Sequence, residues 1–157
     1  MFLRDVFPPG VIKVNLEAED KDEAFEELVD HLCQAGKLNV REEILDALRE
    51  REAKMSTGIQ KGIAIPHGKT NAVDSVCCAL GISRKGVDYD ALDGEPVYLL
   101  FMLAAPQKES EKHLRILKRL AELLENPQFA VELQSQKDAQ GAYRVICKHE
   151  DMIIARE

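Results

Sequence analysis

The 157-residue chain lacks any apolar run that approaches the roughly 20 residues needed to cross a bilayer. Its first residues also lack an apolar stretch long enough for a signal peptide. Basic side chains are outnumbered, because 21 Lys and Arg stand against 28 Asp and Glu, for a net charge of −7. This balance argues against a general nucleic-acid binder, which needs a basic face. We therefore expect a cytoplasmic protein with no stable membrane insertion and no nucleic-acid partner.

Metal-binding and disulfide patterns are also missing. The four cysteines form no CxxC pair, and the four histidines show no HxH, HxxxH or HExxH spacing. The adjacent Cys77 and Cys78 fall in a strand-like run, so they should point to opposite faces as reduced packing residues. A GxxxxGK[ST] phosphate loop and a GxSxG elbow are absent as well. We expect no metal and no nucleotide cofactor.

Length and hydrophobic pattern predict one α/β domain that spans residues 1–157. Helical spacing predicts helices over residues 21–35, from 39 to 51, from 110 to 124, and from 127 to 146. Apolar runs predict strands over residues 11–16, 63–65, 75–82 and 97–104, with a short last strand at 152–155. The three middle strands follow one another without long helices between them. We therefore expect a mixed sheet with some antiparallel pairs, flanked by helices on both faces.

Capping signals predict where several helices begin or end. Gly36 stands in a helix-stop position, and Asn39 with Glu42 has the side chains of a capping box. Ser110 is expected to cap the long helix over residues 110–124. Asn126, followed by a proline, is expected to cap the next one.

Two of the four histidines occupy informative places. His67 follows a short apolar strand and a proline, at a strand end where α/β proteins usually carry their sites. His113 falls in the first turn of the helix that Ser110 opens, where free N–H groups attract anions and lower a histidine pKa. Spacing alone leaves open that both are structural. His31 is expected at the surface or boundary, and His149, among charged neighbours, in solvent.

One arginine stands out in the charged helix end at residues 49–52. Most such runs form solvated faces, but Arg51 lies on the inward register of its helix. It also leads directly into a polar loop that contains Ser56 and Thr57. Arg51 is therefore a candidate for contact with an anion.

The sequence resembles the mannitol/fructose-type A component of enzyme II of the phosphoenolpyruvate-dependent sugar phosphotransferase system. The resemblance covers nearly the whole chain. It is carried by RE at 51–52, STGI at 56–59, GIAIPHG at 62–68, DALDGEPV at 90–97 and HL at 113–114. It implies the mixed α/β fold of that family and a phosphohistidine carrier that needs neither a metal nor a nucleotide.

The resemblance also implies roles for individual residues. His67 would accept a phosphoryl group from phospho-HPr or an HPr-like donor. His113 and Arg51 would stabilise that group without accepting it, and Ser56 and Thr57 would form the supporting loop. A metal-dependent hydrolase that uses both histidines is the remote alternative from another class.

Two downstream roles remain open. A free-standing A component resembles the nitrogen-regulatory branch, whose members act by phosphorylation-dependent binding to target proteins. The alternative is a fructose- or mannitol-specific component that passes phosphate to a B component for sugar uptake. One departure concerns Gln60, which stands where the family commonly has glycine. It could remove a position that needs positive φ, and so alter the loop and partner docking.

Overall fold

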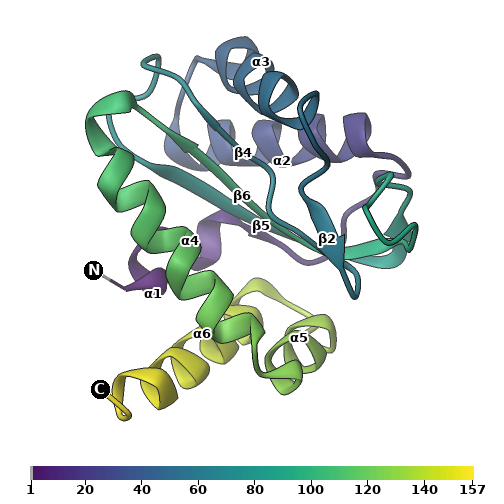
Figure 1. Cartoon of the computed structure of the whole chain (residues 1–157), viewed down its shortest axis with the longest axis vertical. Coiled ribbons are helices and arrows are strands. Elements are labelled where there is room, and N and C mark those ends of the chain that lie inside the picture. Colours follow the sequence, from purple (N-terminus) through teal and green to yellow (C-terminus); the bar gives the residue numbers. More distant parts are fainter. Residues whose placement is uncertain (1) are drawn as a thin grey trace.

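The computed structural model describes residues 2–157, which form one six-stranded sheet with helices on both faces (Figure 1). The strands are β1 (Ile12–Lys13), β2 (Gly58–Gln60), β3 (Ile63–Ala64), β4 (His67–Lys69), β5 (Cys77–Val87) and β6 (Val97–Ala105). The α-helices are α1 (Leu3–Val6), α2 (Lys21–Gly36), α3 (Arg41–Glu52), α4 (Ser110–Leu124), α5 (Pro127–Gln134) and α6 (Ala139–Ile154). Short 3₁₀ turns, η1 (Pro9–Val11) and η2 (Gln107–Glu109), precede β1 and α4.

The sheet is mixed, as the strand spacing predicts. Its order is β1-β5-β6-β3-β2, and β4 also pairs with β6. The long central pair β5–β6 is antiparallel, while β3 and β4 both run parallel to β6. β6 is buried along nearly its whole length, because helices cover both of its faces.

Two hydrophobic cores lie on opposite faces of the sheet. α2 and α3 cover one face, and α1, α4, α5 and α6 cover the other (Figure 1). Cys77 packs against the first core and Cys78 lies in the second, which confirms their opposite orientations. All four cysteines are free.

Several boundary predictions are wrong at the helix ends. Gly36 is the last residue of α2, and Lys37 takes the left-handed C-cap conformation with φ of 54°. α3 begins after Val40, which makes no side-chain cap, so the capping box proposed for Asn39 does not form. Ser110 is the first residue of α4 rather than its cap, because η2 runs directly into that helix.

The C-terminal third also differs from expectation. Asn126 caps α5 by accepting a hydrogen bond from the Gln128 N–H, as predicted. The helical segment is then interrupted, and Asp138 caps a separate helix α6. Residues 152–154 continue α6, so no strand forms there, and the first strand shrinks to Ile12–Lys13. No helix within residues 2–157 is both long enough and apolar enough to span a membrane.

The placement of β4 depends on its contacts on two sides. Its residues pair with 103–105 of β6, and the Leu103 N–H donates to the Pro66 carbonyl just before the strand. On the other side Gly68 lies against α3, where a Cβ atom would approach the Ala47 carbonyl carbon and oxygen to 2.6 Å. Glycine is therefore required at 68, and β4 is held tightly between β6 and α3.

Candidate functional site

The structure brings His67 and His113 together. Their ring centroids are 5.5 Å apart, with the ring planes at 84°. His67 opens β4 and is half-buried, whereas His113 lies in the first turn of α4 and is buried. The side chains come from strand and helix elements on rigidly packed backbone, so their separation is set by the fold rather than by a loop.

The hydrogen bonding of His67 defines which ring nitrogen is reactive. Its Nδ1 lies 2.7 Å from the carbonyl oxygen of Ile65. A carbonyl oxygen only accepts, so Nδ1 carries the hydrogen and donates it. The lone pair therefore resides on Nε2, which is the nucleophilic atom of this ring.

His113 is an unusual buried polar group. Only 4% of its surface is exposed, and neither ring nitrogen has a hydrogen-bond partner within residues 2–157. Burial is the largest cause that lowers the pKa of His113 to about 4, and the neighbouring His67 and Lys69 contribute to the same shift. The lowered pKa confirms the direction expected from the sequence, although burial is its first cause. At neutral pH the ring is uncharged and has one N–H to donate.

This burial predicts a pH dependence of folding. The His113 pKa is about 4 when folded and about 6.5 when unfolded, so the unfolded chain binds more protons between these values. The stabilisation from a neutral His113 is complete above pH 6.5 and is lost as the pH falls towards 4. From pH 7 to pH 5 we expect His113 to reduce the unfolding free energy by about 2 kcal/mol.

Urea unfolding at both pH values measures this loss. His113→Gln does not titrate, so the variant should lose about 2 kcal/mol less than the unchanged protein over the same pH interval. Equal losses in the two proteins would contradict a buried, neutral His113.

The structure places Arg51 at the end of α3, just before the loop that contains Ser56 and Thr57. It lies in the last turn of α3, which covers the opposite face of the sheet from α4. Its Nη1 donates to the carbonyl oxygen of Met55 at 2.8 Å. Arg51 follows Ala47, the residue that touches β4, by one helical turn. Its role at the histidine pair stays a prediction.

Ser56 and Thr57 make hydrogen bonds that hold the loop between α3 and β2. The Thr57 hydroxyl donates to a Glu52 carboxylate oxygen at 2.6 Å and bonds the Tyr89 hydroxyl at 2.6 Å. The Thr57 N–H donates to the other Glu52 oxygen at 2.7 Å. The Ser56 hydroxyl accepts from the Gly58 N–H. These bonds tie the end of α3 to the start of β2.

The backbone conformation at Gln60 shows whether this position needs the positive φ that a glycine would allow. Gln60 pairs with Ile63 at the ends of β2 and β3, and the turn between them is Lys61-Gly62. Those two residues carry positive φ, 54° and 78°, as a two-residue hairpin turn requires. Gln60 itself has no positive φ, so the expected loss of such a position is wrong.

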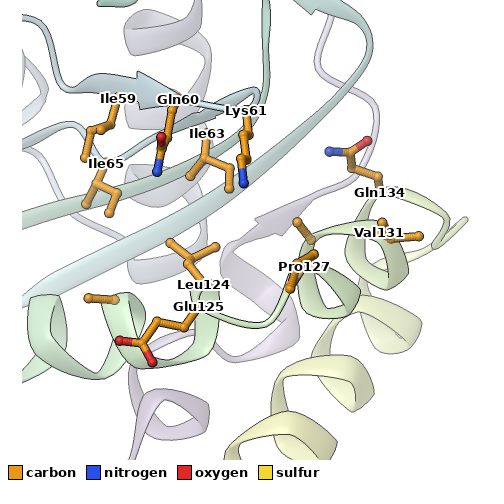
Figure 2. Close-up of a pocket in the computed structure, with 12 residues that line it drawn as sticks. Ile59, Gln60, Lys61, Ile63, Ile65, Leu124, Glu125, Pro127, Val131 and Gln134 are labelled. Atoms are coloured by element: carbon orange, nitrogen blue, oxygen red, sulfur yellow. The ribbon is translucent and has the colours of Figure 1, made fainter. Parts of the chain in front are cut away.

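An apolar hollow of about 480 Å³ lies beside this hairpin (Figure 2). Figure 2 shows side chains of the hairpin on one side and side chains of α4 and α5 on the other. The labelled lining residues are Ile59, Gln60, Lys61, Ile63, Ile65, Leu124, Glu125, Pro127, Val131 and Gln134. The histidine pair is not part of this lining, so the hollow is a separate feature.

The other two histidines lie away from the site. His31 is half-buried in α2, at the boundary as expected. His149 is buried rather than solvated, and it pairs with Glu132 of α5. The charged neighbours of His149 misled the sequence interpretation, because Glu150 is itself buried and accepts from the Leu3 N–H.

Lys69 is a charged neighbour that the sequence interpretation missed. Its Nζ donates to the Ser110 hydroxyl at 2.7 Å and thereby links β4 to the start of α4. The signal was present, since side chains two apart on a strand point to the same face. His67 and Lys69 are two residues apart on β4, so their side chains point to the same face.

The chain is similar to known proteins over most of its length. Residues 5–149 match the family described as phosphoenolpyruvate-dependent sugar phosphotransferase system, EIIA 2. A fructose-specific EIIABC component of Bacillus subtilis is 38% identical over 96% of this chain, which spans only 24% of that protein. A fructose-specific EIIA component of Haloferax volcanii is 36% identical, with 91% of this chain and 93% of that protein covered.

A solved structure is similar throughout. The nitrogen regulatory protein IIA-Ntr from Neisseria meningitidis superimposes with a TM-score of 0.83 at 29% identity, covering 92% of this chain and 98% of that one. The family match takes in both histidines, the loop before them and the whole sheet. The chain therefore belongs to the EIIA type 2 family of the phosphoenolpyruvate-dependent sugar phosphotransferase system.

Proposed function

We propose that the protein is a phosphohistidine carrier, with Nε2 of His67 as the atom that accepts the phosphoryl group. The observation that carries the proposal is the paired geometry of the two rings. The Ile65 carbonyl holds the His67 proton on Nδ1, and the neutral His113 ring lies 5.5 Å away, centroid to centroid. Phospho-HPr, or a donor like it, supplies the phosphoryl group.

The transfer step balances without a metal or a nucleotide. The His67 Nε2 lone pair forms the new N–P bond as the N–P bond of the donor histidine breaks. The bonding pair of electrons returns to the donor ring, and the positive charge moves to His67. The Ile65 carbonyl accepts from Nδ1–H and stabilises this charge. The unpaired N–H of His113 supplies a donor for a phosphoryl oxygen.

Docking of the donor would use apolar side chains that the fold leaves exposed near these elements. Leu114 follows His113 and is 66% exposed, and Met55 and Ile59 extend from the loop and hairpin at 60% and 53%. The net charge of −7 complements a basic donor surface, which raises the association rate. A carrier must release its partners, so affinities should be micromolar or weaker, about −8 kcal/mol or less favourable.

The downstream partner is proposed to be a regulatory target protein whose binding depends on His67 phosphorylation. Support comes from the close superposition on a nitrogen regulatory protein of almost the same length. A sugar-specific B component is the second candidate. It is supported by the 38% and 36% identity to fructose-specific components.

A single assay separates these roles. The protein is first labelled with radioactive phosphate from phosphoenolpyruvate, enzyme I and HPr, and is then mixed with fructose-type and mannitol-type B domains. Retention of the label on His67 supports the regulatory role, and rapid transfer to either B domain supports sugar uptake. Failure of the first, labelling step would overturn the carrier proposal itself.

A further inference from the structure

Lys69 places a positive charge at the histidine pair. It stands two residues after His67 on β4, so both side chains leave the same face of the strand. The Lys69 Nζ reaches the first residue of α4, where it lies 2.7 Å from the Ser110 hydroxyl oxygen. The ammonium group thus spans the gap between the strand that carries His67 and the helix that carries His113.

The first turn of α4 has the features of an anion site. Its backbone N–H groups lie at the positive end of the helix dipole. His113, in the same turn, is 96% buried and has no hydrogen-bond partner within residues 2–157. The charge on Lys69 acts on the His113 ring, because it contributes to the lowered pKa of that ring. A buried donor without a partner and an adjacent cation both suit a phosphoryl group.

The bond to Ser110 does not explain the position of Lys69 by itself. Lys69 is exposed, and fixing a long exposed side chain for one neutral acceptor costs about as much side-chain entropy as the bond returns. A dianionic phosphoryl group is a far better acceptor than a hydroxyl. Arg51, the cation expected from the sequence, donates to the carbonyl oxygen of Met55 in this structure.

We propose that Lys69 binds the phosphoryl group on His67, so that its ammonium moves from the Ser110 hydroxyl to a phosphoryl oxygen during transfer. This inference rests on the proposed function of His67. Lys69 supplies the charge, His113 supplies a neutral N–H, and the first turn of α4 supplies backbone donors. His113 and the backbone donors belong to α4, and Lys69 is bonded to the first residue of that helix.

The test uses two donors, phospho-HPr and phosphoramidate. Phosphoramidate has no protein surface. His67 Nε2 attacks its phosphorus, the P–N bond breaks, and ammonia leaves with the bonding electrons. Lys69→Met should slow His67 phosphorylation about tenfold with both donors, which is below the about 100-fold typical of a fully buried donor because Lys69 is exposed. The phosphohistidine should also hydrolyse at an altered rate.

Three further variants separate charge from structure. Lys69→Gln keeps a donor for Ser110 but removes the charge, and should be as slow as Lys69→Met. Lys69→Arg should retain most of the rate. Lys108→Met makes the same charge change at an exposed lysine of η2 and should match the unchanged protein. Melting temperatures of all variants should agree within a few degrees.

Each contrary outcome has a distinct meaning. A slow rate with phospho-HPr alone would make Lys69 a docking residue and overturn the proposal. A normal rate in Lys69→Gln, or a loss of folding in both neutral variants, would make it structural and overturn the proposal equally. If the unchanged protein takes no label, or takes it on another residue, the proposed function of His67 fails instead.

Discussion

Replacement of His67 by alanine is expected to abolish acid-labile phosphorylation by phospho-HPr completely. The variant lacks the Nε2 lone pair, and no other side chain occupies the start of β4 to replace it. The His113 ring of the pair remains, but burial leaves it 4% exposed, so a donor protein cannot approach it in line. Radiolabel transfer from phosphoenolpyruvate, followed by acid treatment, measures the result.

His31→Gln is the matched control for this loss. His31 is also a half-buried histidine, but it lies on α2 rather than in the histidine pair, so its removal should leave labelling unchanged. Full labelling of His67→Ala, or loss of label in the control, would refute the assignment of His67.

Replacement of His113 by alanine should slow transfer without moving the phosphate. Loss of one donor aimed at developing charge in a buried site typically costs about 10²–10³ in rate. The α4 helix should still fold, because its inward residues Ile116, Leu120 and Leu123 are untouched. Single-turnover labelling at saturating donor measures the rate, and mass spectrometry locates the phosphate on His67.

Two results would contradict this role of His113. Phosphate found on His113 of the unchanged protein would make it an acceptor. A wild-type rate in the alanine variant would show that the buried ring serves packing alone. Circular dichroism and thermal unfolding of the variant distinguish a chemical defect from a folding defect.

The sheet and its mixed direction could be predicted because they depend on patterns within short segments. The apolar run of β6 and the absence of a helix between β3 and β6 are visible in the sequence. The ends of helices were harder to predict. Ser110 has the side chain of a helix cap, but η2 runs directly into α4, so Ser110 is the first helical residue instead. The local sequence is compatible with several first residues for this helix, and tertiary packing determines which one is used.

The candidate site could be predicted only in part for the same reason. His67 is marked by the proline and glycine around it, and Gly68 is needed because Ala47 approaches so closely. The position of Arg51 depends on which face of the sheet α3 covers, and no local pattern specifies that face. The burial of His149 depends on Glu132, in another helix, and Lys69 gains significance only once Ser110 is seen beside it.

The pairing of β4 with β6 has a consequence for the order in which the molecule is made. His67 lies opposite Leu103 in the sheet, and its ring lies beside His113, so both its strand partner and its ring partner come later in the chain. A nascent chain that ends before β6 holds His67 on an unpaired segment. The ribosome must therefore release the first turn of α4 before the histidine pair can form, and the protein acquires its site late in synthesis.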